Sequence, residues 1–210
     1  RNQVVDRGVY LDLCYFEPKS GLNTDHMELY KSNQFTVVRQ LHYSTKNENS
    51  IDMVLFLNGL PIVTMELKNQ LTGQNIVHSQ NQYKNDRDPK EALLQFKRCM
   101  VHFGVDNNAV CMTTRLSGQG TRFFPFNKEL ENPAVDNGYR TKYMWEEILT
   151  PDSLLDILEN FVHISEDKDL FFNEKTQKVE SKTSEALVFS RYPQLNLIRK
   201  FRNQIKEKFR

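Results

Sequence analysis

The sequence is poor in cysteine. The chain of 210 residues contains only Cys14, Cys99 and Cys111. An odd number of widely separated cysteines argues against a disulfide framework, and no two of them stand at a spacing typical of zinc ligands. We therefore expect three buried or inert thiols in the reducing environment of a cytoplasmic protein.

Long hydrophobic runs and an excess of charge of one sign are also missing. No run is long enough to span a membrane, and no signal-peptide pattern is present. Hydrophobic residues make up 39% and charged residues 26% of the chain, as in ordinary soluble globular proteins. Because 28 basic side chains nearly balance 27 acidic ones, any site for a polyanion must be a local patch.

The length allows one sizeable domain, or one domain with a short appendage. The chain begins with Arg1 rather than methionine and ends within a basic, helix-like pattern. We therefore expect it to be a fragment of a longer protein.

The hydrophobic pattern predicts strands in the first half of the chain and helices in the last third. The predicted strands or extended segments cover residues 7–16, 33–43, 51–57, 60–68, 108–114 and 121–127. The predicted helices cover residues 88–103, 143–149, 151–164 and 191–210, and the polar stretch 165–185 is predicted to be a linker. This order of elements indicates an α/β domain followed by a helical segment, with Trp145 as a core anchor of that segment.

One predicted hairpin carries unexpected charges. The stretch from Ser50 to Gln70 reads SIDMVLFLNGLPIVTMELKNQ, two apolar runs joined by an Asn-Gly pair that is typical of a tight β-turn. The first run begins with Asp52, and the second ends with Glu66 and Lys68. Charged side chains at one end of an otherwise buried hairpin suggest a functional site.

The positions of these charges on the hairpin decide whether they can act together. Successive strand residues point to opposite faces, so Glu66 and Lys68 share one face and Leu67 lies on the other. Whether Asp52 shares the face of Glu66 depends on the turn.

Two turn geometries are possible. A two-residue turn at Asn58-Gly59 would pair Asp52 with Met65, on the wrong face. A three-residue loop over 57–59, with its glycine in the left-handed conformation, would pair Asp52 with Thr64 and bring the charges together. An active site at this hairpin therefore predicts the three-residue, bulged turn.

The chemistry of two carboxylates and an ammonium suits phosphodiester hydrolysis. A hard ion such as Mg²⁺ accepts carboxylate oxygens and keeps several waters, and the backbone carbonyl of Leu67 could supply a further ligand. Lys68 could hold or help to deprotonate the attacking water and offset charge on the transition state. The alternative is an exposed strand end whose charges are simply solvated.

These residues also resemble a known family. The arrangement of Asp52 and Glu66-Leu67-Lys68 resembles the core of PD-(D/E)xK nucleases. More narrowly, NQFTVV followed by IDMVLFLNGLPIVTMELKN is similar to the motor and nuclease (R) subunit of type I restriction enzymes. The segments QNQYK, FFPFN, YRTKYMWEEIL and FSRYPQL follow in a similar order, so the resemblance covers most of the chain from residue 33 to about 204.

The resemblance implies a fold and a set of site residues. The implied fold is a restriction-endonuclease-like α/β core, with a central mixed sheet flanked by helices and a C-terminal helical segment. The family's metal-binding acids correspond to Asp52 and Glu66, and its catalytic lysine corresponds to Lys68. The implied metal is Mg²⁺.

A helix after the core carries weaker candidates. The family has a Gln-x-x-x-Tyr element near the active site, and Gln80 and Tyr83 are its nearest equivalents, although they are only three residues apart. Lys84 and Arg87 begin a basic stretch that extends to residue 102 and could neutralise DNA phosphates. An ordinary polar, solvated helix face would explain the same side chains.

The C-terminal stretch resembles the start of a motor domain. RYPQL is similar to the adenine-reading glutamine motif of superfamily two helicases, which implies that Gln194 contacts adenine. No GxxxxGK[ST] loop occurs, so this chain alone is no working ATPase, and ATP binding belongs to the full-length protein. The implied division is an endonuclease domain over 1–140, a helical trailer and linker over 141–180, and a truncated motor domain over 181–210.

The resulting hypothesis is the Mg²⁺-dependent endonuclease domain of a type I restriction enzyme. It would cut double-stranded DNA, with cleavage coupled to ATP-driven translocation and to the methyltransferase (M) and specificity (S) subunits. One alternative is a catalytically silent, nuclease-like module for DNA binding or assembly. Another is a standalone repair nuclease, against which the helicase-like C-terminal segment argues.

Overall fold

The computed structural model describes residues 3–20, 22–173 and 177–208. Its strands are β1 (Gln3–Asp6), β2 (Val9–Asp12), β3 (Phe35–His42), β4 (Ser50–Leu57), β5 (Leu60–Leu67), β6 (Val101–Val105), β7 (Val110–Thr113), β8 (Phe124–Pro125), β9 (Val162–Asn173) and β10 (Lys178–Phe189). Its helices are α1 (Thr24–Lys31), η1 (Gln70–Thr72), α2 (Ile76–Asn85), η2 (Met144–Ile148), α3 (Pro151–Asn160) and α4 (Tyr192–Lys208).

A six-stranded mixed sheet forms the centre of the fold, in the order β3-β4-β5-β6-β7-β8. The pair β5 and β6 is parallel, and the other neighbours are antiparallel. A parallel pair needs a long crossover, and here the crossover carries η1 and α2. The predicted α/β class with a central mixed sheet flanked by helices is confirmed.

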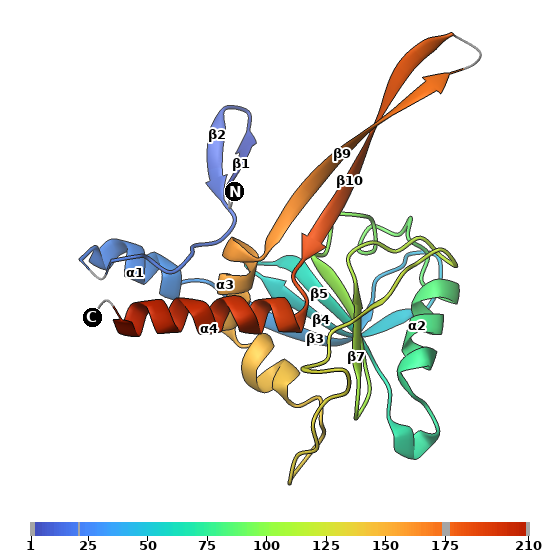
Figure 1. Cartoon of the computed structure of the whole chain (residues 1–210), viewed down its shortest axis with the longest axis horizontal. Coiled ribbons are helices and arrows are strands. Elements are labelled where there is room, and N and C mark those ends of the chain that lie inside the picture. The colour runs from blue at the N-terminus through green and yellow to red at the C-terminus, as the bar shows by residue number, and fades with distance from the viewer. Residues whose placement is uncertain (1–2, 21, 174–176, 209–210) are drawn as a thin grey trace.

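Helices cover both faces of this sheet (Figure 1). On one face, Leu154 of α3 and Leu195 of α4 join the larger hydrophobic core with Met65 and Phe103 of the sheet. On the other face, Tyr83 of α2 belongs to a smaller core. The charged end of the hairpin formed by β4 and β5 lies beside this smaller core.

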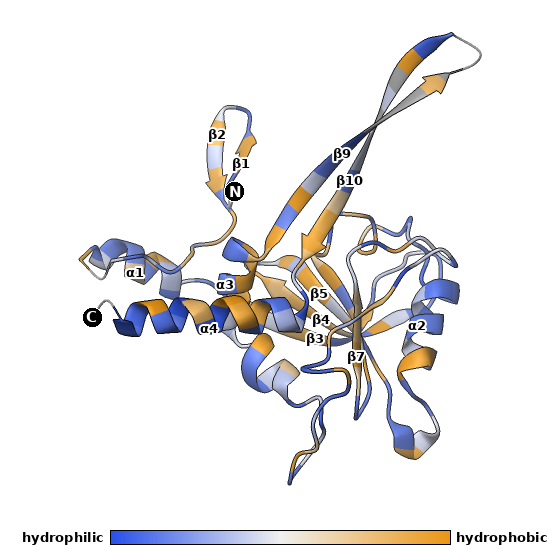
Figure 2. Cartoon of the chain, viewed as in Figure 1, coloured by the Kyte–Doolittle hydropathy of each residue, from blue (hydrophilic) through white to orange (hydrophobic). Residues whose placement is uncertain are grey.

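The stretch 165–185 is not the predicted linker. Residues 165–173 and 178–185 lie in β9 and β10, which pair from Val162 with Phe189 to Asn173 with Lys178 as a two-stranded antiparallel hairpin. Figure 1 shows this hairpin projecting from the body, and Figure 2 shows hydrophilic and hydrophobic residues mixed along it. A ribbon exposed on both faces needs no regular apolar alternation, which explains why the sequence pattern did not indicate strands.

The helix predicted over 88–103 is also wrong. The chain makes turns after Asp88 and enters the buried strand β6 at Val101. All five residues of β6 are buried between β5 and β7, and such a central strand shows a continuous apolar run rather than alternation.

The helices after residue 140 form as predicted with two exceptions. The helix predicted over 151–164 ends at Asn160, because Val162 already begins β9, and the predicted core tryptophan is not buried. Met144 and Ile148 of η2 are buried, whereas Trp145 is 51% exposed and is no core anchor. No helix among the described residues has the length and apolar character needed to cross a membrane.

Gly104 in β6 sets how closely α2 can approach the sheet. Its register partner in β5 is Glu66, and a Cβ atom added at Gly104 would overlap Ser79 of α2 and lie 2.9 Å from Cys111 Sγ. A side chain at this position must therefore displace Ser79 of α2 or the neighbouring Cys111.

We expect Gly104→Ala to lower the free energy of unfolding by about 1–3 kcal/mol, because overpacking strains a close-packed contact. Gly120→Ala is the matched control, since its Cβ would meet nothing closer than the Ser117 carbonyl oxygen at 3.4 Å. Urea unfolding measures both variants. Equal stability of the two would show that α2 is free to shift.

Candidate active site

The turn of the β4–β5 hairpin differs from the predicted one. Asn58 (φ 48°) and Gly59 (φ 81°) form a two-residue turn that pairs Leu57 with Leu60. Positive φ at both central positions is the geometry that favours Asn-Gly. The predicted three-residue loop, and with it the pairing of Asp52 with Thr64, is wrong.

The register is corrected further along the hairpin. Phe56 pairs with Pro61, but Leu55 pairs with Val63, so Ile62 is an extra residue in β5. Such a β-bulge moves every later residue of its strand by one position. Pro61 has no backbone N–H to donate to the ladder, which makes this part of the strand a suitable place for an irregularity.

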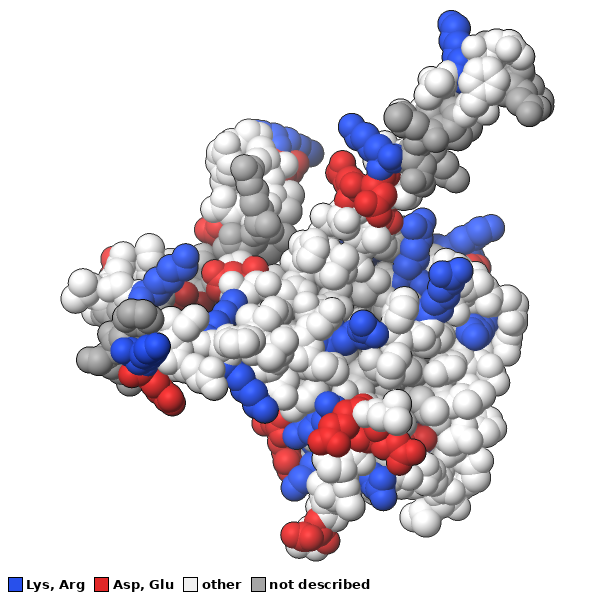
Figure 3. Space-filling model, in the orientation of Figure 1, with Lys and Arg blue, Asp and Glu red and all other residues white. Residues whose placement is uncertain are grey.

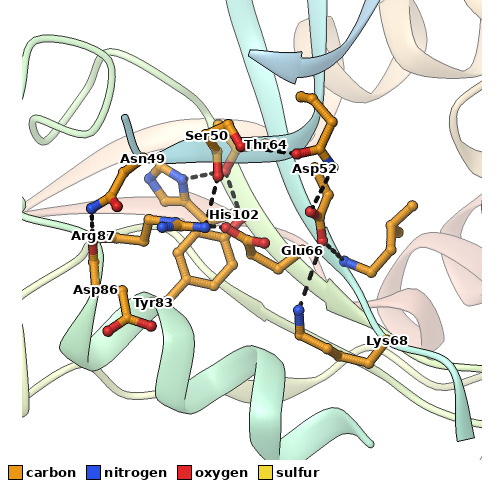
Figure 4. A network of polar contacts seen from close by, with 12 residues as sticks. Asn49, Ser50, Asp52, Thr64, Glu66, Lys68, Tyr83, Asp86, Arg87 and His102 are labelled. Carbon is orange, nitrogen blue, oxygen red and sulfur yellow. Dashed lines mark hydrogen bonds and ion pairs between the residues drawn. The ribbon is translucent and has the colours of Figure 1, made fainter. Parts of the chain in front are cut away.

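The bulge brings the two acidic residues to one face. Beyond it, Val54 pairs with Thr64 and Met53 with Met65, and the same register continued places Asp52 opposite Glu66. Directly opposed residues of an antiparallel pair lie on the same face. The bulge in β5, rather than the turn, thus brings Asp52 to the face of Glu66. Figure 4 shows both carboxylates projecting to the same side of the hairpin.

Asp52 lies at the centre of a polar cluster. Its Oδ2 accepts a hydrogen bond from the backbone N–H of Leu67 at 2.8 Å and lies 3.8 Å from Lys68 Nζ. Its Oδ1 accepts from Gln40 Nε2 at 3.0 Å. The side chains of Asp52 and Lys68 are only 21% and 10% exposed, so these charges are not the solvated strand end of the alternative interpretation.

Gln40 is a site residue that no sequence pattern singled out. It lies in the middle of β3 with φ 49°, in the left-handed region that residues other than glycine rarely adopt. Its side-chain oxygen accepts from Ser50 Oγ at 2.8 Å while its amide donates to Asp52. Strained backbone that supports a polar cluster is frequent at functional sites.

Glu66 is completely buried and is held by an arginine. Arg87 Nε donates to Glu66 Oε1 at 2.7 Å, and Arg87 Nη2 donates to the carbonyl of Ser50 at 2.7 Å. Among the described residues, none provides a hydrogen-bond partner for Glu66 Oε2. One carboxylate oxygen is thus anchored and the other is left for a ligand.

The electrostatics of the site follow from this burial. Loss of hydration raises the pKa of Glu66 to about 8, against the opposing effect of Arg87, and the nearby Asp52 carboxylate raises it further. A bound cation would relieve both effects by favouring the ionised carboxylate.

A second buried polar network lies on the same face of the hairpin, one strand position before Glu66 on that face. Thr64 Oγ1 lies 2.8 Å from the hydroxyl of Tyr83 and 2.7 Å from His102 Nδ1. Burial lowers the pKa of His102 to about 4, so the imidazole is neutral at physiological pH and serves as a structural hydrogen-bonding group. This network fixes α2 against β5.

The helix candidates from the sequence lie in different environments. Tyr83 is fully buried and reaches the hairpin, while Gln80, one turn earlier, lies by Cys111 and lowers the pKa of that thiol, which burial raises overall. Lys84 is half-buried on α2. Arg87, predicted as a support or DNA contact, is buried and directed at Glu66 instead of the surface.

The face seen in Figure 3 carries both basic and acidic side chains. On the visible side, Lys and Arg side chains gather beside the base of the β9–β10 hairpin, and acidic side chains gather lower on the same side (Figure 3). Lys97, part of the predicted basic stretch, pairs with Glu185 of β10 at 2.7 Å. DNA contact through this stretch stays a prediction.

The residues of the cluster fit a divalent ion that is bound by few protein ligands. The described residues contain no group of three or more His, Cys, Asp and Glu side chains suited to a metal. Mg²⁺, however, is commonly held by one or two carboxylates and water. The unpartnered Oε2 of buried Glu66, beside the Asp52 carboxylate, is the observation that favours such an ion.

Comparison with known proteins identifies the family of the chain. Residues 17–121 match the family model described as the type I restriction enzyme R protein N terminus, and the match includes β3 to β7 and α2. The chain belongs to this family. It also shares 27% identity over 146 residues with the type I restriction enzyme HindI endonuclease subunit of Haemophilus influenzae. That alignment covers 67% of this chain and only 14% of the relative.

The predicted adenine contact lies outside the matched region. Gln194 is in the first turn of α4, and its side-chain oxygen accepts from the backbone N–H of Arg191 at 2.9 Å. In this structure Gln194 therefore caps a helix, and its role toward adenine stays a prediction.

The raised pKa of Glu66 predicts a pH-dependent stability. Because the folded-state pKa of about 8 lies above the ordinary value of 4.5, the stabilising contribution of protonated Glu66 is complete below about pH 4.5. It is lost as the pH rises through about 8. Without divalent ions, the free energy of unfolding of the wild type relative to Glu66→Gln should fall over this range, at roughly 1.4 kcal/mol per pH unit at most.

Denaturant titrations of both proteins at a series of pH values measure this difference. The loss of the carboxylate partner of Arg87 shifts the variant by an offset and does not alter the slope. A difference that stays constant from pH 4.5 to 8 would show that Glu66 is ionised throughout.

Proposed function

We propose that this chain is the Mg²⁺-dependent endonuclease domain of a type I restriction enzyme R subunit and hydrolyses phosphodiester bonds of double-stranded DNA. The observation that carries the proposal is the register of the β4–β5 hairpin, which opposes Asp52 to Glu66 and places Lys68 beside them. Membership of the R protein family supports it and argues against a standalone repair nuclease.

The residues of the site have distinct roles in this proposal. Asp52 and Glu66 Oε2 would hold Mg²⁺, with the backbone carbonyl of Leu67 as a further ligand. The ion, when bound, supplies Lewis-acid polarisation of the scissile phosphate. The ammonium group of Lys68, already directed at the cluster, would donate to the attacking water or to a phosphate oxygen and offset the negative charge of the transition state.

Elements around the hairpin keep this site in place. Tyr83 holds α2 to Thr64, and Gln40 holds Asp52 from β3. Gln80 and Lys84 would support the helix or contact DNA on the same side. Hydrogen bonds to the ligand carboxylates restrict their rotation, so the site is organised before substrate arrives.

The larger reaction requires more than this chain, which spans 14% of its relative. We infer that the core of the endonuclease domain lies within residues 1–140. The predicted boundary at residue 181 falls inside β10, which pairs with β9, so we place the start of the motor domain after Phe189. In the full protein, a cytoplasmic complex with methyltransferase and specificity subunits would couple ATP-driven translocation to cleavage, with Gln194 contacting adenine.

A second candidate is a catalytically silent module. The observation that favours it is that the protein already pairs both acids, since Leu67 N–H and Lys68 contact Asp52, and Arg87 contacts Glu66. In that case the cluster would stabilise the domain only, and the domain would serve DNA contact or assembly.

Substitution of Asp52 and Lys68 tests the two candidates. In the full-length R subunit assembled with its partner subunits, Asp52→Asn and Lys68→Ala should each lower Mg²⁺-dependent DNA cleavage by at least about 100-fold, because each removes charge stabilisation from the transition state. DNA-stimulated ATP hydrolysis of the same complexes is the control and should persist.

The outcome separates the candidates cleanly. Cleavage at wild-type rates in either variant, with intact ATP hydrolysis, would leave the silent module as the function. Loss of both activities together would indicate misassembly of the complex. Lys142→Ala is the control for this outcome, because Lys142 lies on the surface ahead of η2 and outside the site.

A further inference from the structure

Arg87 connects three parts of the structure at the proposed active site. It follows the C-terminal end of α2, and its Nε and Nη2 donate to Glu66 Oε1 of β5 and to the carbonyl of Ser50 at the start of β4. The guanidinium carbon also lies 6.0 Å from the centre of the Tyr43 ring. The side chain is 5% exposed, so it is held on several sides.

These contacts determine the orientation of the Glu66 carboxylate. With Oε1 bound by Arg87, rotation of the carboxylate would break a charge-assisted hydrogen bond in a buried environment. Oε2 is therefore the oxygen that stays available, next to Asp52. Only arginine offers two donors in a rigid fork that can bridge a carboxylate and a backbone carbonyl at the same time.

Arg87 does not lie between the two carboxylates. The hydrogen bonds of Asp52 go to Gln40 and to the backbone of Leu67, and Lys68 is its ion-pair partner. An arginine that occupied the place of a metal ion would bridge both acids, and this one contacts Glu66 from the side of Ser50. Its burial equally argues against direct contact with a DNA phosphate.

We propose that Arg87 is a positioning residue for Glu66, which anchors Oε1 so that Oε2 alone is presented to a divalent ion. The inference rests on the proposed nuclease function and adds a residue to it. It also predicts that Glu66 binds the ion through one oxygen only.

The test uses Arg87→Ala and Arg87→Lys in the full-length R subunit within its complex. Substitution of a group that orients a metal ligand typically costs about 10-fold to 100-fold in metal affinity or activity. We expect the Mg²⁺ concentration for half-maximal cleavage to rise by about 10-fold or more in Arg87→Ala. Arg87→Lys, which keeps the charge but has no fork, should show a smaller rise.

A second readout does not depend on cleavage. Mn²⁺ binding to the complex without DNA, measured by calorimetry, should weaken in the same order, while the affinity for DNA in the absence of divalent ions stays within about 2-fold, because Arg87 is buried. Lys31→Ala is the control, because it removes the same charge in the last turn of α1, distant in sequence from the site. It should leave the Mg²⁺ requirement, the Mn²⁺ affinity and the DNA affinity unchanged.

The outcomes distinguish this inference from its alternatives. Weaker DNA binding with an unchanged Mg²⁺ requirement would make Arg87 a phosphate contact, and tighter Mn²⁺ binding would make it a competitor of the ion; either overturns the proposal. If Arg87→Ala fails to fold, an unchanged Mn²⁺ affinity of a folded Arg87→Lys variant would overturn it as well. Intact cleavage in Lys68→Ala would instead refute the nuclease function itself.

Discussion

The site depends on one irregularity in strand pairing, the extra residue Ile62 in β5. Side chains alternate along a strand, so a shift of one residue exchanges the two faces of everything beyond it. Without the bulge, the two-residue turn at Asn58-Gly59 would place Glu66 on the face opposite Asp52. With it, apolar residues face the larger core, and two acids and a lysine meet beside α2. Turn and bulge together thus define where the charges converge.

The cost of burying Glu66 explains much of the surrounding architecture. A carboxylate without exposure is destabilising unless opposite charge and hydrogen bonds compensate, and here Arg87 compensates on one oxygen only. The close packing of α2 over Gly104 and the hydrogen bond between Tyr83 and Thr64 hold the helix that Arg87 follows. The other oxygen, Glu66 Oε2, has no hydrogen-bond partner among the described residues, and a divalent ion would supply the missing opposite charge.

The sequence predicted the sheet and the acidic pair because both leave strong local signals. Alternating and apolar runs located the strands β3, β4, β5 and β7, and Asp52 with Glu66 stood out against an apolar hairpin. Pro61 indicates that the strand can be irregular nearby, but the position of the bulge at Ile62 depends on pairing along the whole hairpin. The sequence also did not predict the ribbon of β9 and β10, because a ribbon solvated on two faces shows no regular apolar periodicity. The role of Gln40 was missed because its contact with Asp52 is made across strands and leaves no local pattern.

If Asp52 and Glu66 together hold a divalent ion, anomalous X-ray scattering from crystals grown with Mn²⁺ will locate it. We expect one anomalous peak at the end of β4 and β5, in contact with one oxygen of Asp52 and with Oε2 of Glu66, while Arg87 remains on Oε1. An ordered site with both carboxylates in their present contacts and no peak between them, at Mn²⁺ concentrations that support cleavage, would contradict it.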